Sequence, residues 1–159
     1  MKIIKELVPY VLIVIFVVLL RTFIITPVKV DGASMDNTLK DGQVLLLYKL
    51  AKINRYDIVV VDEENIDEVI IKRVIGMPGD TIEINHSSIY INGKVIDDKY
   101  GVGKTSDYAE ITLGDDEYFV LGDNREVSKD SRYFGAVKEN EIKGQTIYRL
   151  WPFTKLGKI

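Results

Sequence analysis

Cysteine is absent from the 159-residue chain, and histidine occurs only once, as His86. The absence of cysteine excludes disulfide bonds, thiolate-ligated zinc and thiol nucleophiles. A Ser-His-Asp triad would have to use His86, which lies between two alternating runs where we expect a solvated hairpin turn. Histidine and carboxylate residues show no metal-site spacing, so we expect neither a metal nor a cofactor.

A strong excess of one charge is also missing, because the formal net charge is only −3. Nucleic-acid binding usually needs a basic patch, so we expect no nucleic-acid partner. The apolar content of 47% is enough for a hydrophobic core, and the length suits one domain with an appendage.

A single long hydrophobic run covers residues 7–25. About 20 apolar residues are needed to cross a bilayer as a helix. Lys2 and Lys5 precede the run, which predicts a cytoplasmic N-terminus and an extracytoplasmic body. A core helix and a cleaved signal peptide are the alternatives. The continuity of the run and the lack of a small-residue cleavage site in "TPVKVDGAS" favour an uncleaved transmembrane anchor over residues 1–26.

The remainder, residues 27–159, has short β-type runs and no amphipathic helical period. We predict a mostly β domain, an antiparallel folded sheet or barrel, with strands within residues 28–32, 43–50, 57–64, 68–76, 81–96, 117–123 and 144–153. Asn92-Gly93 between alternating residues indicates a tight hairpin. The irregular stretch 97–116 indicates a surface excursion or an inserted lobe, and we place a smaller β lobe at roughly 82–117.

Lys72 stands inside the β-branched run "EVIIKRVIG". Alternate residues of a strand face opposite sides, so either Lys72 or Arg73 faces an apolar environment, unless the strand lies at an edge with both charges in water. Burial lowers the pKa of a lysine because the charged form loses hydration. A neutral lysine amine can act as a general base toward a serine hydroxyl.

Ser34 is the serine that fits such a base, since it follows Asp31-Gly32-Ala33. Small residues allow a substrate backbone to approach closely, and amides at a bend can hold an oxyanion. The alternative is an ordinary turn serine.

These stretches together resemble the bacterial type I signal peptidases, which are membrane-bound Ser/Lys serine endopeptidases. "RTFIITPVKVDGASM" behind the anchor and "SMDNTL" are similar to the family's nucleophile box, and "KDGQVLLLYK" is similar to the segment that follows it. "KRVIGMPGD" and "GDNREVSKDSR" match the lysine box and the last box. The resemblance covers nearly the whole chain in order, and it implies removal of N-terminal signal peptides from exported preproteins.

The resemblance also implies roles for single residues. Ser34 would be the nucleophile and Lys72 the general base. Ser128 would orient the lysine amine through its hydroxyl, and Asp130 and Arg132 would form a structural ion pair near the site.

Substrate recognition follows from the same resemblance. Gly32 takes the position that contributes to the oxyanion hole, together with the Ser34 amide. The substrate would bind as an extended strand, with small side chains at the first and third positions before the cut. The shallow pockets for those side chains would be lined by Val30, Met35, Leu39, Ile70 and Ile71.

Two positions raise separate expectations. Asn37 stands where the resembled family usually has proline, and asparagine also tolerates turn geometry. Trp151 and Phe153 lie close together near the end of the chain, and aromatic residues favour the membrane interface. We therefore expect contact with membrane lipid beyond the anchor, with packing of both rings in the β core as the alternative.

Two other functions share some of these features. A self-cleaving Ser/Lys repressor has similar serine and lysine motifs, but the anchor and the lack of a helix-turn-helix region disfavour it. An anchored β domain could bind exported polypeptides without cleaving them. Retention of Ser34, Lys72 and Ser128 favours the enzyme.

Overall fold

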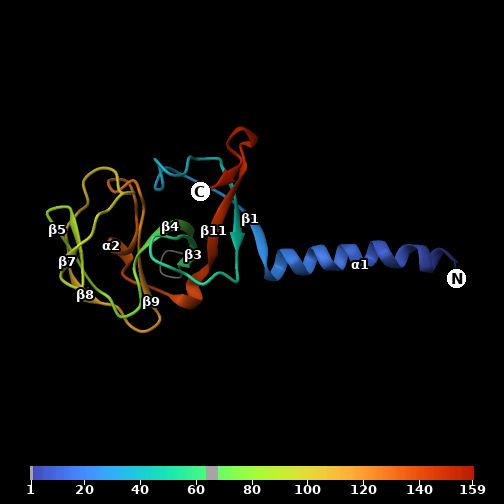
Figure 1. Ribbon diagram of the computed structural model, residues 1–159, viewed down its shortest axis with the longest axis horizontal. Coiled ribbons are helices and arrows are strands. Elements are labelled where there is room, and N and C mark those ends of the chain that lie inside the picture. Colours follow the sequence, from blue (N-terminus) through green and yellow to red (C-terminus); the bar gives the residue numbers. More distant parts are fainter. Residues whose placement is uncertain (1, 64–67) are drawn as a thin grey trace.

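The computed structural model describes residues 2–63 and 68–159; Met1 and Glu64, which belong to the predicted anchor and a predicted strand, lie outside this part. Helix α1 (Lys2–Phe23) extends away from a β-rich body (Figure 1). Its segment Glu6–Phe23 has a mean hydropathy of 2.2 and is not buried, so α1 has the length and composition to cross a membrane. Strand β1 (Ile25–Lys29) follows directly, so the predicted anchor boundary at residue 26 overlaps the first strand.

The larger sheet of the body runs in the order β1-β2-β11-β3-β4-β9-β10, with β12 added beside β11. Its paired strands are antiparallel, as predicted from the short alternating runs. Beyond β1, its strands are β2 (Val44–Tyr48), β3 (Ile58–Glu63), β4 (Glu68–Gly76), β9 (Glu117–Leu121), β10 (Val137–Lys138), β11 (Ile142–Trp151) and β12 (Gly157–Lys158). Among the described residues the body also has three short helices: α2 (Ser131–Phe134), η1 (Glu139–Glu141) and η2 (Phe153–Lys155).

A second sheet lies between β4 and β9 in the sequence, in the order β7-β6-β5-β8. It contains β5 (Thr81–Asn85), β6 (Ser88–Ile91), β7 (Lys94–Val95) and β8 (Tyr108–Thr112). Two-residue turns with positive φ at both positions join β5 to β6 at His86-Ser87 and β6 to β7 at Asn92-Gly93. The second turn confirms the Asn92-Gly93 hairpin, and exposed His86 is a turn residue.

Both faces of the larger sheet are covered at β3. Ile58 and Val60 of β3 belong to one buried cluster, whereas Val59 and Val61 belong to another. The sequence of β3 from Ile58 to Val61 is continuously apolar instead of alternating because neither face of this strand meets water. A third cluster joins Ile75 of β4 to the small sheet.

The short strands β10 and β12 lie outside the predicted ranges, and the first strand and β8 also differ from the sequence-based expectation. The first strand covers residues 25–29 instead of 28–32. β8 lies inside the stretch interpreted as irregular, because pairing with β5 stabilises it although only part of its surface is buried. An edge strand of this kind carries little hydrophobic pattern.

Candidate active site

The turn that carries Ser34 connects β1 and β2. Its backbone is tied by hydrogen bonds from the Thr38 and Leu39 amides to the Met35 carbonyl, at 3.1 and 2.8 Å. Gly32 adopts a φ of +80°, and its amide donates to Asp41 Oδ1 at 3.0 Å. Glycine adopts such a conformation without steric cost, so the sharp bend before Ser34 follows from the local sequence.

Lys72 lies on β4 and reaches the Ser34 turn. Its Nζ donates a hydrogen bond to Ser34 Oγ at 2.9 Å, although the residues are 38 positions apart in the sequence. Lys72 is only 3% exposed, whereas Ser34 is partly accessible. The structure therefore brings together the two residues that the sequence marked as a base and a nucleophile.

Arg73, the next residue, faces the other side of β4 and is only 4% exposed. It donates from Nε and from one terminal nitrogen to the two oxygens of Asp123, at 2.8 and 2.6 Å. The alternative of an edge strand with both charges in water is therefore wrong. Each side chain is buried on its own face, and the charge of Arg73 is neutralised by a bidentate pair.

The segment after β9 closes the site on another side. The Asn124 amide donates to the Ser34 carbonyl at 3.0 Å. A Cβ added to Gly122 would lie 2.1 Å from Ser128 Oγ and 2.5 Å from the Ser34 carbonyl oxygen. Only glycine leaves room for the Ser128 side chain and the Ser34 backbone to meet there. Sequence reasoning assigned no role to Gly122, Asp123 or Asn124, although all three stand in the "GDNREVSKDSR" stretch.

Ser128 is buried, at 2% exposure, and its hydroxyl has no hydrogen-bond partner among the described residues. Such orphaned groups are uncommon in folded proteins and often have a functional explanation. Asp130 and Arg132 form a bidentate ion pair at 2.8 and 2.9 Å. Asp130 also accepts from the Gly122 amide at 3.0 Å, so the pair holds the segment that contacts Ser34.

The two expected oxyanion donors differ in their surroundings. The Gly32 amide already donates to Asp41, an acceptor that sequence reasoning did not connect with the site. The Ser34 amide donates to none of the residues that the structure describes. Of the two, the Ser34 amide is therefore the donor that can bind a new oxygen.

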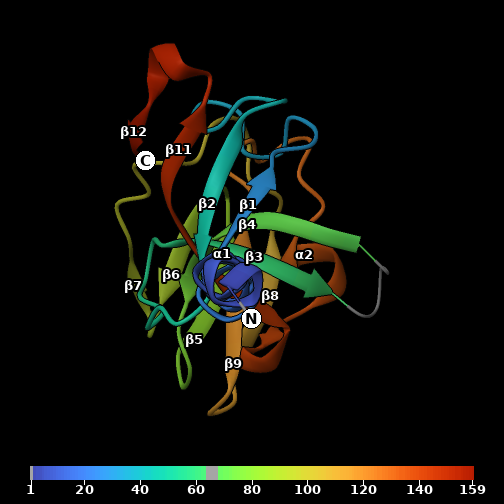
Figure 2. The same ribbon diagram turned by 90° about the vertical axis from the view of Figure 1, so that its right-hand side faces the viewer.

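A groove of about 590 Å³ runs past Ser34 and Lys72, between β1 and the first half of β4. Figure 2 shows these two strands close to each other. β4 pairs with β9 only from Arg73 onward, so in the described structure residues 69–71 have no strand on the side away from β3. The groove is lined by Val28, Lys29, Asp31, Gly32, Ser34, Val69, Ile70, Ile71 and Lys72.

The expected pocket residues divide into two groups. Ile70 and Ile71 line the groove. Val30, Met35 and Leu39 do not line it, because they are buried in the hydrophobic cluster behind it. Of the groove residues, Ile71 belongs to that cluster and Val28 packs against it. Val30, Met35 and Leu39 thus lie beneath the groove in this structure, and sequence reasoning did not name the lining residues Val28, Lys29, Asp31 and Val69.

Among the described residues, no three His, Asp or Glu side chains cluster in a way that could hold a metal ion. At Ser34 the groove offers a hydroxyl, the Lys72 amine and backbone amides. This set suits acyl transfer through a serine nucleophile.

The comparisons with known proteins agree with this chemistry. The family model for signal peptidase, peptidase S26, matches residues 3–151. A signal peptidase I of Streptococcus pneumoniae is 37% identical over 96% of this chain and 95% of its own. A signal peptidase IB of Staphylococcus aureus is 38% identical over 84% and 81%.

A solved signal peptidase I of Enterococcus faecalis is 35% identical, with a TM-score of 0.54 over 60% of this chain and 97% of that one. The family match spans α1 as well as the β body, and the relatives cover most of the chain. The chain therefore belongs to the signal peptidase family, peptidase S26, and is a membrane-anchored serine endopeptidase.

Proposed function

We propose that this peptidase removes N-terminal signal peptides from exported preproteins with Ser34 as nucleophile and Lys72 as general base. The observation that carries the proposal is the 2.9 Å contact between Lys72 Nζ and Ser34 Oγ beside an accessible groove. A neutral Lys72 amine takes the hydroxyl proton over this contact while Oγ bonds to the scissile carbonyl carbon.

The tetrahedral intermediate places negative charge on the former carbonyl oxygen. The Ser34 amide donates to this oxygen, and the exposed bend at Gly32 lets the substrate backbone approach. The carbon–nitrogen bond then breaks, and the Lys72 ammonium returns its proton to the leaving amine. Water, activated by the same amine, hydrolyses the Ser34 ester.

Ser128, Asp130 and Arg132 have supporting roles. The buried Ser128 hydroxyl, which has no hydrogen-bond partner among the described residues, is available to orient the Lys72 amine. Because Gly122 has no side chain, this hydroxyl can lie close to the Ser34 backbone. The Asp130–Arg132 pair holds Gly122 in position through the Gly122 amide. The ion pair is thus structural and does not take part in proton transfer.

The test is cleavage of a preprotein by the purified full chain beside Ser34→Ala, Lys72→Ala and the double variant. Each single change should abolish cleavage. The double variant should be hardly worse than either single one, because the two residues act as a unit. Ser88→Ala and Lys94→Ala, which change the same residue types in the small sheet, serve as controls that should retain activity. Cleavage at the normal rate by Ser34→Ala or Lys72→Ala rules out the dyad.

The open edge of β4 supports recognition of an extended substrate. Residues 69–71 pair with no described strand on the side away from β3, so a preprotein segment can add to the sheet there as a strand. Buried Val30, Met35 and Leu39 close the space behind the groove, which keeps the side-chain pockets shallow. The enzyme therefore accepts small residues at the first and third positions before the cut.

A preprotein series with Ala, Leu or Glu at these two positions tests the specificity. Alanine should be cleaved best, and Ile71→Ala should raise cleavage of the leucine substrate by enlarging the wall of the groove. Equal cleavage of all three substrates by the unchanged enzyme contradicts shallow pockets.

The body lies on the extracytoplasmic side and touches lipid beyond α1. Lys2 and Lys5 precede the apolar part of α1, which favours a cytoplasmic N-terminus. Trp151 and Phe153 are 49% and 75% exposed and form an edge-to-face pair with ring centres 4.9 Å apart. The alternative in which both rings pack in the core is therefore wrong. Protease added outside intact cells should digest the body and leave an N-terminal tag protected.

A further inference from the structure

Residues 98–106, between β7 and β8, form a segment that we call the strap. The strap belongs to the part of the chain that the sequence marked as irregular, and it contributes nothing to the groove. It leaves the small sheet and lies along residues 122–126. These are the residues that contact the backbone of Ser34 and the side chain of Arg73.

The strap is hydrogen-bonded to this segment through its backbone. The Val102 amide donates to the Asp123 carbonyl at 2.8 Å, and the Arg125 amide donates to the Val102 carbonyl at 2.9 Å. Val102 and Asn124 form a parallel bridge. Val102 of the strap is therefore hydrogen-bonded to Asp123 and Arg125. These two residues flank Asn124, whose amide donates to the Ser34 carbonyl.

Side chains strengthen the attachment. Arg125 is buried and pairs with Asp98 of the strap at 2.6 Å. Asp98 also accepts from the Gly101 amide at 3.2 Å, which closes a turn. A Cβ on Gly101 would lie 2.6 Å from the central carbon of the Arg125 guanidinium, so the turn packs directly on that group.

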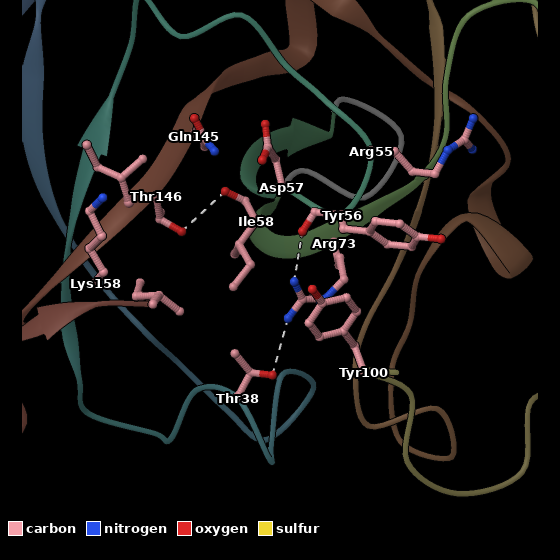
Figure 3. Close-up of a pocket in the computed structure, with 12 residues that line it drawn as sticks. Thr38, Arg55, Tyr56, Asp57, Ile58, Arg73, Tyr100, Gln145, Thr146 and Lys158 are labelled. Atoms are coloured by element: carbon pink, nitrogen blue, oxygen red, sulfur yellow. Dashed lines mark hydrogen bonds between the residues drawn. The ribbon is translucent and has the colours of Figure 1, made fainter. Parts of the chain in front are cut away.

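This turn presents Tyr100 to Arg73. The Arg73 guanidinium carbon lies 3.7 Å from the centre of the Tyr100 ring, the distance of a close cation–π contact. Figure 3 shows the ring against the guanidinium, with hydrogen bonds from Arg73 to the Tyr56 carbonyl at 2.8 Å and to Thr38 Oγ1 at 3.2 Å. Thr38 belongs to the Ser34 turn and also donates to Asp123.

Arg73 thereby joins the three parts of the site. It adjoins Lys72 on β4, pairs with Asp123 in the segment that contacts Ser34, and donates to Thr38 in the Ser34 turn. A guanidinium can make these bonds together only when its plane is fixed. The Tyr100 ring covers one face of that plane.

We propose that Tyr100, carried by the strap, is a positioning residue for catalysis. Its ring fixes the Arg73 guanidinium, and through Asp123 and Thr38 this keeps Ser34 in line with Lys72. The proposal rests on the Ser34–Lys72 dyad proposed above. It assigns the inserted lobe a part in catalysis, in addition to its own packing.

The experiment measures kcat and KM for preprotein cleavage with Tyr100→Leu and Tyr100→Phe in the full chain. Leucine keeps apolar bulk without an aromatic face, so kcat should fall about tenfold, the size of a desolvated cation–π contact converted to a rate. KM should stay within about twofold, because Tyr100 does not line the groove. Phenylalanine keeps the ring and should restore kcat.

Tyr90→Leu is the matched control, since Tyr90 lies on β6 of the same lobe and is also half-buried. It should leave kcat unchanged. In an Arg73→Lys background, Tyr100→Leu should lower kcat little further, because the effects of substitutions at contacting residues are not additive. Thermal unfolding of each variant checks that the fold is retained. If Arg73→Lys fails to fold, Tyr100→Leu and Tyr100→Phe by themselves test whether the ring positions the site.

Several outcomes overturn the proposal. They are an unchanged kcat in Tyr100→Leu, an equal loss in Tyr100→Phe, or a rise in KM alone. The unchanged enzyme and Ser34→Ala are measured in parallel. Failure of the unchanged enzyme to cleave, or cleavage by Ser34→Ala, would contradict the dyad itself, which separates that result from a failure of the Tyr100 proposal.

Discussion

Asn37 stands where the resembled family usually has proline, and its backbone conformation is one that proline cannot adopt. It lies three residues after Ser34 and adopts a φ of +96°. Proline, which the resembled family usually has at this position, locks φ near −65°. The turn after the nucleophile therefore has a backbone conformation in this chain that proline cannot adopt.

Replacing Asn37 tests this conformation. Asn37→Pro should lower the free energy of unfolding by more than about 1 kcal/mol and reduce preprotein cleavage, because the turn must rearrange. Asn37→Gly is the comparison. It should keep the free energy of unfolding and the cleavage rate close to those of the unchanged enzyme, since glycine adopts positive φ freely. Chemical denaturation and initial cleavage rates give the two measurements. A proline variant that is as stable and active as the unchanged enzyme would show that the turn changes conformation without cost.

Among the structural elements, the link between β4 and β5 depends on Asp80. This carboxylate accepts from the Met77 amide at 2.7 Å, from Arg55 at 2.9 Å and from Asn92 at 2.9 Å. Burial raises the pKa of Asp80, but these hydrogen bonds and the charge of Arg55 outweigh it, so the pKa lies below its ordinary value of 3.8. Asp80 thus joins the entry to the small sheet to the β6–β7 hairpin and to the loop before β3.

The lowered pKa of Asp80 gives the stability of the fold a definite dependence on pH. The unfolded chain binds the proton more tightly, so this contribution is complete above about pH 3.8 and is lost as the pH falls toward the lower folded pKa. Asp80→Asn should be less stable at pH 7, and its difference from the unchanged protein should shrink below pH 3.8. Urea unfolding at several pH values measures this. Asp97→Asn is the control, because Asp97 is exposed; a constant difference for Asp80→Asn would contradict the assignment.

At the scale of the whole molecule, one side of the body is suited to a membrane surface. Figure 1 shows β1 and β11 on the side from which α1 leaves. β11 ends at Trp151, and exposed Phe153 and Leu156 follow it. A bilayer that holds α1 would therefore lie near these apolar side chains, which favours the interfacial position of the aromatic pair.

Trp151 reports on this contact because it is the one tryptophan in the chain. With the full chain in vesicles, lipids that carry a spin label at the headgroup boundary should quench its fluorescence. A Trp151→Phe, Tyr90→Trp double variant moves the reporter to the small sheet, where the same lipids should quench far less. Equal fluorescence of the Trp151 protein with and without labelled lipid would place the aromatic pair in water.

The amino-acid sequence by itself determined the parts that depend on local chemistry. A run of 7–25 without acidic residues has one stable arrangement across a bilayer, and Asn92-Gly93 has the backbone freedom that a two-residue hairpin requires. The chain has no cysteine and only one histidine, which leaves little room for Cys-His or Ser-His-Asp catalysis. Together with the motifs around Ser34 and Lys72, this composition indicated a Ser/Lys peptidase. The comparisons confirm the family.

Only the tertiary structure decided which faces are covered and which distant segments meet. The period of two places Lys72 and Arg73 on opposite faces, but it does not show that both faces are buried, since coverage comes from strands and loops far along the chain. The burial of Val30, Met35 and Leu39 in one cluster likewise depends on strands that are distant in the sequence. Tyr100 lies in a stretch without periodicity, and its place over Arg73 results from pairing of the strap with residues 122–126, a long-range contact that local pattern does not encode.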